Sequence, residues 1–163
     1  MPVALLLLLA GCATGPAEGG PINTGESENE VCSPTGNETE FLLALPISLD
    51  PSTQVEFSTV ALVDATNVEL VESRFAPVDL DHQYIIERYP LRDEVDRAWG
   101  DGERVDGFRM QAGDGFELIL KVKTTDAGQS GSVGALQVDY TADGTAYRYT
   151  SQVAYELASG ECD

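Results

Sequence analysis

Apolar and polar residues alternate along the last part of the chain, on both sides of an Asp-Gly pair. Leu136, Val138 and Tyr140 share one face of an extended segment, and Asp143-Gly144 follows them. The same alternation resumes beyond the pair with Tyr147, Tyr149, Val153, Tyr155 and Leu157. An Asp-Gly pair between alternating runs is a strong hairpin signal, because both residues tolerate positive φ. The sequence therefore predicts an antiparallel hairpin whose apolar face must be buried against a second layer.

Earlier segments carry related patterns. The runs 55–63 and 68–72 are rich in β-forming residues and are separated by a polar, turn-like interval, and the run 83–89 ends at Pro90. Between 116 and 123 apolar residues alternate with mostly charged ones, which places one face inward and the other outward. About seven short strands with frequent turns are typical of a sandwich. We therefore expect an all-β, two-sheet β-sandwich of the immunoglobulin-like kind.

One segment departs from the period of two. Leu91, Val95 and Trp99 lie four residues apart, which predicts a short helical excursion within 91–100. Gly102 and Gly107 then interrupt the chain before the next apolar residue. We expect Trp99 to pack this excursion onto the sandwich, since burial is the usual fate of a tryptophan.

The first residues form an apolar run, 3–10, that is about half as long as a membrane-spanning helix requires. A short apolar run that ends on small residues is typical of an export signal. The stretch Leu9-Ala10-Gly11-Cys12 resembles the lipobox of bacterial lipoprotein precursors. This resemblance implies cleavage after Gly11 and acylation of Cys12. It also implies a lipid anchor that holds the mature chain at the extracytoplasmic face of the cell membrane.

The chain is thus expected to have three parts. Residues 1–11 form the signal peptide and residues 12–39 a lipidated, acidic tether. The tether is rich in Gly, Pro, Ser, Thr, Asn and Glu and has almost no apolar residues to collapse it, which predicts disorder. Residues 40–163 form the β-sandwich domain.

The remaining cysteines are Cys32 and Cys162. Once Cys12 carries lipid, these two form an even pair in an exported, oxidising compartment, which predicts a disulfide. A redox-active pair would favour close Cys-x-x-Cys spacing, which this pair does not have. We therefore expect a structural bridge between the two ends of the domain.

The charge of the chain excludes several classes of partner. Its 163 residues include 9 Lys and Arg against 28 Asp and Glu, for a formal net charge of −19 and a pI near 4.1. Repulsion from phosphate makes nucleic acid a poor partner and opposes docking on anionic lipid through protein charge. We interpret the excess of Asp and Glu as a solvated acidic surface.

Residues for catalysis or metal binding are sparse in the sequence. Its one histidine, His82, follows Asp81, and the stretch 128–132 lacks the frame of a nucleophile elbow, so we predict no catalytic residue. A copper site needs clustered Met, His or free thiolate, which the chain does not offer. Acidic residues crowd the helical excursion, but their spacing does not match an EF-hand. These are Asp93, Glu94, Asp96, Asp101, Glu103 and Asp106. No metal site and no cofactor are predicted.

A second, weaker resemblance covers the C-terminal part. Trp99, the stretch "GDGFELILKV", the stretch "VDYTADGTAYRY" and Cys162 together resemble a pattern of exported actinobacterial proteins, and no activity comes with it. The sequence favours a non-enzymatic, lipid-anchored domain that binds a protein or cell-envelope partner. The alternative is a small-ligand or cation-binding lipoprotein that works with a transporter.

Overall fold

The Asp-Gly hairpin forms as predicted. The computed structural model describes residues 15–25, 28–77 and 86–162. Strands β12 (Ala135–Ala142) and β13 (Thr145–Thr150) pair antiparallel around Asp143 and Gly144, whose φ angles are +49° and +76°. Both residues therefore occupy the left-handed region that this tight turn requires. The predicted inward face of β12 is buried.

The hairpin belongs to one layer of a two-layer structure. The neighbours of β12 are β13 on one side and β5 on the other, and β5 pairs briefly with β9. One residue separates β11 from β12, and two separate β13 from β14, so the pair β11–β14 continues this layer, with β3 parallel to β14 at its edge. The bounds are β3 (Asn29–Pro34), β5 (Val55–Val63), β9 (Arg109–Met110), β11 (Gly131–Val133) and β14 (Val153–Ala158).

The second layer is built around β10, which pairs antiparallel with β4 on one side and β6 on the other. Short strands extend its edges: β2 and β7 pair with opposite ends of β4, and β8 pairs with β6. The bounds are β2 (Ile22–Asn23), β4 (Glu40–Leu49), β6 (Val68–Pro77), β7 (Ile86–Arg88), β8 (Glu103–Arg104) and β10 (Gly115–Thr124).

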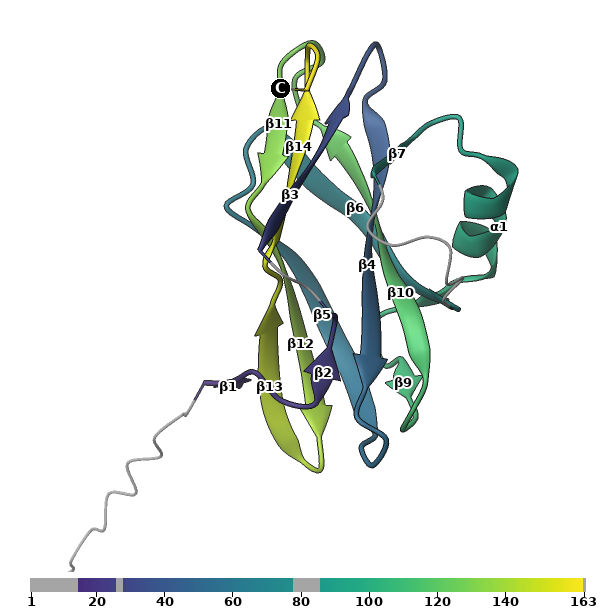
Figure 1. The fold of residues 1–163 in the computed structure, drawn as a ribbon, viewed down its shortest axis with the longest axis vertical. Helices are drawn as coiled ribbons and strands as arrows, with labels where there is room; N and C mark the ends of the chain where they lie inside the picture. Colours follow the sequence, from purple (N-terminus) through teal and green to yellow (C-terminus); the bar gives the residue numbers. More distant parts are fainter. Residues whose placement is uncertain (1–14, 26–27, 78–85, 163) are drawn as a thin grey trace, which may run out of the picture.

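The strand order is that of an immunoglobulin-like sandwich. The order β4-β10-β6 corresponds to strands B-E-D of that fold, and β5-β12-β13 corresponds to C-F-G on the facing sheet. Figure 1 shows the two layers face to face along the long axis of the molecule. The predicted all-β, two-sheet immunoglobulin-like sandwich is confirmed. Its disulfide, however, does not link the facing sheets as the antibody bridge does.

The core between the layers contains a row of phenylalanine rings. The ring centroid of Phe75 lies 4.5 Å from that of Phe57 and 4.7 Å from that of Phe108, and Phe108 lies 5.0 Å from Phe116. The three pairs are tilted, stacked and edge-to-face respectively, and aromatic contacts of this kind add to the stabilisation from burial alone. Phe108 belongs to the long connection from β6 to β10, and Val105 and Met110 of this connection are also buried in the core, so the core holds its last part in place.

The same connection contains the predicted helix. Helix α1 (Asp93–Asp101) lies on the outer face of the β4-β10-β6 sheet, on the right of Figure 1. The spacing of Leu91, Val95 and Trp99 therefore predicted the helix correctly. Among the described residues, no helix is long and apolar enough to span a membrane.

The N-terminal part of the described chain differs from the prediction. We expected disorder through residue 39, but β1 (Ala17–Glu18) pairs with β13, β2 pairs with β4, and β3 pairs with β14. These short strands satisfy their backbone groups on sheet edges, and only Ile22 and Val31 pack apolar side chains against the core. Ordered structure thus begins before residue 40, because pairing to a preformed edge does not require an apolar sequence.

The disulfide lies at the end of the sandwich where β3 and β14 finish. The sulfur atoms of Cys32 and Cys162 are bonded at 2.10 Å, with 6.0 Å between their Cα atoms. Thr35, just beyond β3, donates hydrogen bonds to Ala158 O from its backbone N (2.8 Å) and from its hydroxyl (3.1 Å). The structure contains the predicted bridge, which joins the first long strand to the C-terminal residues.

Candidate interaction surface

Helix α1 covers apolar residues on the outward face of the β4-β10-β6 sheet. Leu42, Ala76 and Ile119 point away from the main core but are buried, with Ile119 only 3% exposed. The residues that cover them are partly buried: Tyr89, Leu91, Val95, Ala98 and Trp99. The expectation that Trp99 packs the excursion onto the sandwich is confirmed.

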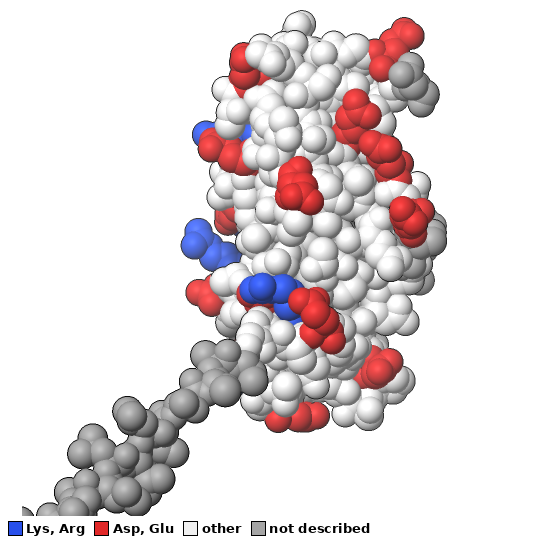
Figure 2. Space-filling view, turned by 90° about the vertical axis from the view of Figure 1, so that its left-hand side faces the viewer, with Lys and Arg blue, Asp and Glu red and all other residues white. Residues whose placement is uncertain are grey.

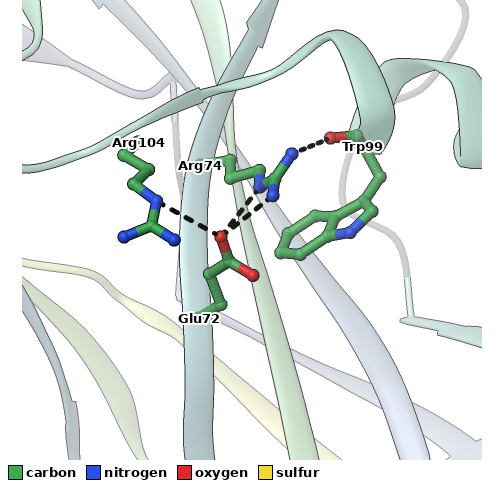
Figure 3. A network of polar contacts seen from close by, with 4 residues as sticks. All are labelled: Glu72, Arg74, Trp99 and Arg104. Carbon is green, nitrogen blue, oxygen red and sulfur yellow. Dashed lines mark hydrogen bonds and ion pairs between the residues drawn. The ribbon is translucent and has the colours of Figure 1, made fainter.

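A polar network joins this helix to β6 (Figure 3). The Arg74 guanidinium lies 4.8 Å from the centroid of the Trp99 ring, and Nη1 of Arg74 donates a hydrogen bond to Trp99 O at 3.0 Å. Nε and Nη2 of Arg74 lie 3.1 and 3.0 Å from Oε1 of Glu72, which Arg104 approaches from β8 at 3.8 Å. Arg74 therefore positions both the helix and the carboxylate on the edge strand.

A stretch of the β6 edge is open beside this network. On the side away from β10, β8 pairs with β6 only at Arg74 and Phe75, so no strand among the described residues pairs with the stretch from Val68 to Ser73 on that side. A β-bulge lies in this stretch: Leu70 is opposite Val122 and Glu72 opposite Lys121, which leaves Val71 without a register partner on β10. Unpaired backbone groups of this kind can accept a further strand.

Val71 is the exposed apolar residue of this edge. Its exposure is 48%, and it is the one large hydrophobic residue that is exposed in the described part of the chain. The ion pair Lys123–Glu69 (2.5 Å) lies on one side of it, and the Glu72–Arg74 pair lies on the other. We call the stretch Val68–Ser73 with Arg74 the β6 edge site.

Other edges of the sandwich are covered in part, and none of them carries an exposed large hydrophobic residue within the described ranges. β1 lies on the outer edge of β13, while β2 and β7 cover the two ends of β4. β5 pairs with β9 at Val55 and Glu56, and the backbones of Phe57 and Gly107–Phe108 are hydrogen-bonded just beyond. The rest of β5 borders the same open side as β6. Which strands lie at an edge depends on the order of strands in the whole sheet, so the β6 edge site was not identified from the sequence.

Charge on the surface is mostly negative. Figure 2 shows one face of the molecule, on which Asp and Glu are spread from end to end while Lys and Arg form a few isolated spots. Several basic residues are already engaged with acids. Arg148 binds Asp139 through two hydrogen bonds of 2.7 and 2.8 Å, and the guanidinium holds the pKa of that carboxyl below its usual range. Lys121 lies 3.0 Å from Glu40, whose hydrogen bond raises the pKa of the ammonium group.

The predicted site residues are distributed as follows. Cys12 and His82 lie outside the described residues. Helix α1 and the chain after it carry the acidic residues of the excursion, and in the described ranges no three His, Cys, Asp or Glu side chains converge in a way that could hold a metal ion. Of the residues singled out in the sequence analysis, the structure brings Cys32 and Cys162 together as a bonded pair.

A solvent-open hollow of about 520 Å³ lies near the disulfide end. The segments 33–38 and 86–90 line it, and in it Arg88 donates a hydrogen bond to Pro34 O at 3.2 Å. Small-molecule sites are usually concave and predominantly apolar, with a few convergent polar groups. This hollow is polar and open, so it does not resemble such a site.

The fold and the edge site define an immunoglobulin-like β-sandwich domain with a helical insert between the strands that correspond to D and E. No protein-family model matches the sequence, and no curated protein matches it.

Solved structures match at low similarity. One is the VesB protease of Vibrio cholerae, with a TM-score of 0.42 and 5% identity over 80% of this chain and 30% of that chain. A second is a PapD-like domain of human CEP192, with a TM-score of 0.42 and 8% identity over 100% of both chains. A third is a family 123 glycoside hydrolase from Clostridium perfringens, with a TM-score of 0.36 and 14% identity over 79% of this chain and 22% of that one. Similarity this low gives no information about activity.

Proposed function

We propose that this protein is a non-enzymatic, lipid-anchored domain on the extracytoplasmic face of the cell membrane, where it binds a protein partner through the β6 edge site. The observation that carries the proposal is the stretch Val68–Ser73, which no described strand pairs on its outer side and which carries the exposed Val71. A partner segment in extended conformation would continue the line of β8 and add a strand to the sheet. Main-chain hydrogen bonds would supply affinity, and contact with Val71 would supply specificity.

The charge of the chain selects among partners. Two copies of a chain with a net charge of −19 repel each other, and bulges with flanking charges are features by which edge strands avoid pairing with their own kind. Glu69 and Glu72 flank Val71 on the edge. We therefore infer a different protein as the partner, with a neutral or basic extended segment, and exclude nucleic acid.

The anchor is the second part of the proposal. It rests on the segment Leu9-Ala10-Gly11-Cys12 and on its resemblance to the lipobox. Two or three acyl chains on Cys12 would hold the domain stably at the membrane, because each buried CH₂ contributes about 0.8 kcal/mol and a single chain is insufficient. Cys12→Ala should abolish lipid labelling and release the protein from the membrane fraction. Unchanged membrane association would contradict the anchor.

The edge site is tested by crosslinking in the producing cells. A photo-reactive amino acid at position 71 should give a discrete crosslinked product that the same probe at Thr145, an exposed position on β13, does not give. With the probe moved to the exposed neighbouring position 69, Val71→Glu should abolish the product, since it adds a charge to the contact, whereas Val71→Thr keeps the β-branched shape and should retain most of it. Equal products from positions 71 and 145, or a product that survives Val71→Glu, would contradict the edge site.

A further inference from the structure

The structure determines at which end the chain enters the sandwich. β1 runs parallel to β13, with Ala17 opposite Tyr147 and Glu18 opposite Arg148. β13 begins at Thr145, directly after the Asp143–Gly144 turn. Because paired parallel strands run in the same direction, the residues before Ala17 approach β1 from the end of the sandwich that carries this turn. Figure 1 shows β1 at that end, far from the C-terminus.

Hydrogen bonds fix the segment that follows β1. Gly19 N donates to Arg148 O at 3.2 Å, and the Tyr140 hydroxyl donates to Gly19 O at 2.7 Å. Gly20 has a φ of +102°, and a Cβ at this position would lie 2.3 Å from Tyr140 Oη. Only glycine can therefore bring the backbone this close to the tyrosine.

The segment then crosses to the other sheet at the same end. Ile22 pairs with Leu49, the last residue of β4, and Asn23 O accepts a hydrogen bond from the Ser48 hydroxyl at 2.8 Å. The turn after β4 leads into Val55, which lies opposite Ala142 beside the hairpin turn. We call this end, with the turns 50–54 and 143–144, the proximal end. The opposite end, with the turn 64–67 and the Cys32–Cys162 disulfide, is the distal end.

The length of chain before β1 limits how far the domain can stand from its anchor. Four residues lie between Cys12 and Ala17, and the five Cα–Cα steps that join these two residues span about 18 Å in a fully extended chain. The sandwich is longer than this, because the ten residues of β10 alone extend over about 33 Å. A lipid on Cys12 therefore lies within reach of the proximal end and out of reach of the distal end.

We propose that the proximal end faces the lipid bilayer and that the domain stands on it, with the distal end pointing away. This inference rests on the proposed lipid anchor at Cys12. From the sequence we expected a long, disordered tether between lipid and domain. In this proposal the domain is instead held close to the membrane in a preferred orientation. Acidic residues at the proximal end, such as Asp50 and Asp143, oppose adsorption on anionic lipid, so the attachment comes from the acyl chains and not from protein charge.

The orientation also places the β6 edge site. Val68 pairs with Thr124 at the end of β10, whereas Gly115 at its start pairs with Ser48 at the proximal end. The open stretch Val68–Ser73 therefore lies in the distal half of the sandwich. A partner would reach this stretch from the extracytoplasmic space, on the side away from the membrane.

Energy transfer to the membrane tests the orientation. The lipidated full-length protein is reconstituted in phosphatidylcholine vesicles that contain headgroup-labelled acceptor lipid, with a fluorescent amino acid at Asp143 or at the exposed Gly160 near the disulfide. Transfer from position 143 should exceed transfer from position 160 several-fold. Equal transfer from the two positions would overturn the orientation, and so would weak transfer from both, which would show that the domain is held away from the bilayer.

Variants of the N-terminal segment test the cause. Gly20→Ala should release the segment from Tyr140 and reduce the difference between the two positions, whereas Gly15→Ala, which meets no neighbour within 4 Å, should preserve it. Inserting twenty Gly and Ser residues after Gly15 adds a coil of about 25 Å without altering the folded contacts, and it should lower transfer from position 143. Unchanged energy transfer from position 143 after this insertion would show that the short segment between Cys12 and β1 does not hold the domain near the membrane.

The outcome distinguishes the orientation from the anchor. The mass of the N-terminal peptide and co-sedimentation with vesicles report lipidation independently of energy transfer. A lipidated, vesicle-bound protein with equal transfer from both positions refutes the orientation and leaves the anchor intact. An unmodified Cys12 with no vesicle binding refutes both.

Discussion

Removing the Cys32–Cys162 disulfide should lower the free energy of unfolding, mainly because the unfolded chain gains conformational entropy without the bridge. The bridge spans a sequence separation of 130 residues, and a closed loop of that length corresponds to about 5 kcal/mol in the chain-entropy description. The folded state has other means of holding the same strands together. Six register pairs join β3 to β14, and Thr35 donates two hydrogen bonds to Ala158 O. We therefore expect C32S/C162S to fold and to lose about 3 to 5 kcal/mol.

Urea denaturation followed by Trp99 fluorescence measures this loss. Both proteins carry Cys12→Ser, so that neither lipid nor a third thiol interferes. The reduced parent is the matched control, because it lacks the bridge but keeps both cysteines, and it should unfold at the same midpoint as the double variant. The dependence of the unfolding free energy on urea should increase, since a chain without the bridge exposes more surface when it unfolds.

Two results would refute this reasoning. A loss below about 1 kcal/mol would show that the unfolded chain gains little freedom when the bridge is removed. A loss well above 5 kcal/mol would show that the bridge also holds β3 in the folded state, against the expectation from its ladder. Thr35→Val separates the two contributions, because it removes a buried hydroxyl contact to Ala158 and should cost about 1 kcal/mol with the bridge intact.

Two further predictions concern packing and pH. Trp99→Ala should cost about 2 to 3 kcal/mol in urea denaturation followed by circular dichroism, because it uncovers Ile119 and removes the ring beneath Arg74, and a loss below 0.5 kcal/mol would contradict the packing role of α1. Burial raises the pKa of Tyr140 from 10.0 to about 12, so its contribution to stability is complete below pH 10 and is lost as the pH rises toward 12. Alkaline titration followed by tyrosinate absorbance measures this pKa. The parent protein should show a tyrosine that ionises near pH 12, and the Tyr140→Phe variant should lack it.

The local signals in the sequence predicted the corresponding elements well. The hairpin around Asp143–Gly144 depends on two residues that tolerate positive φ, and both signal and structure are local. The same holds for α1, whose apolar residues recur with a helical period. The first three strands could not be predicted in this way. β1 and β2 contain two residues each, and they form because the edges of β13 and β4 are available to them. That availability is a property of the whole fold.

Ile119 shows how a correct pattern can still mislead about exposure. The alternation along β10 assigns this residue to the outward face with Lys121 and Lys123, and the structure places it there. It is nevertheless buried, because α1 packs over it. An isolated isoleucine among charged outward residues, together with an amphipathic helix in the preceding connection, is the signal that could have connected the two. The alternation along a strand therefore tells which residues face outward. Whether those residues are exposed to solvent also depends on whether an inserted helix, such as α1, packs over them.

The β6 edge site follows from a comparable break in pattern. Leu70 and Val71 are adjacent apolar residues in a strand that otherwise alternates, so only one of them can face the core of a regular strand. The structure resolves this conflict with a bulge: Leu70 packs toward the core, and Val71 is displaced outward as the extra residue. Bulges are concentrated at sheet edges because an extra residue disrupts the ladder on both sides of a central strand. Adjacent apolar residues also occur in the central strand β10, so the pair alone does not identify an edge, and the exposed valine follows from the bulge that the register with β10 reveals.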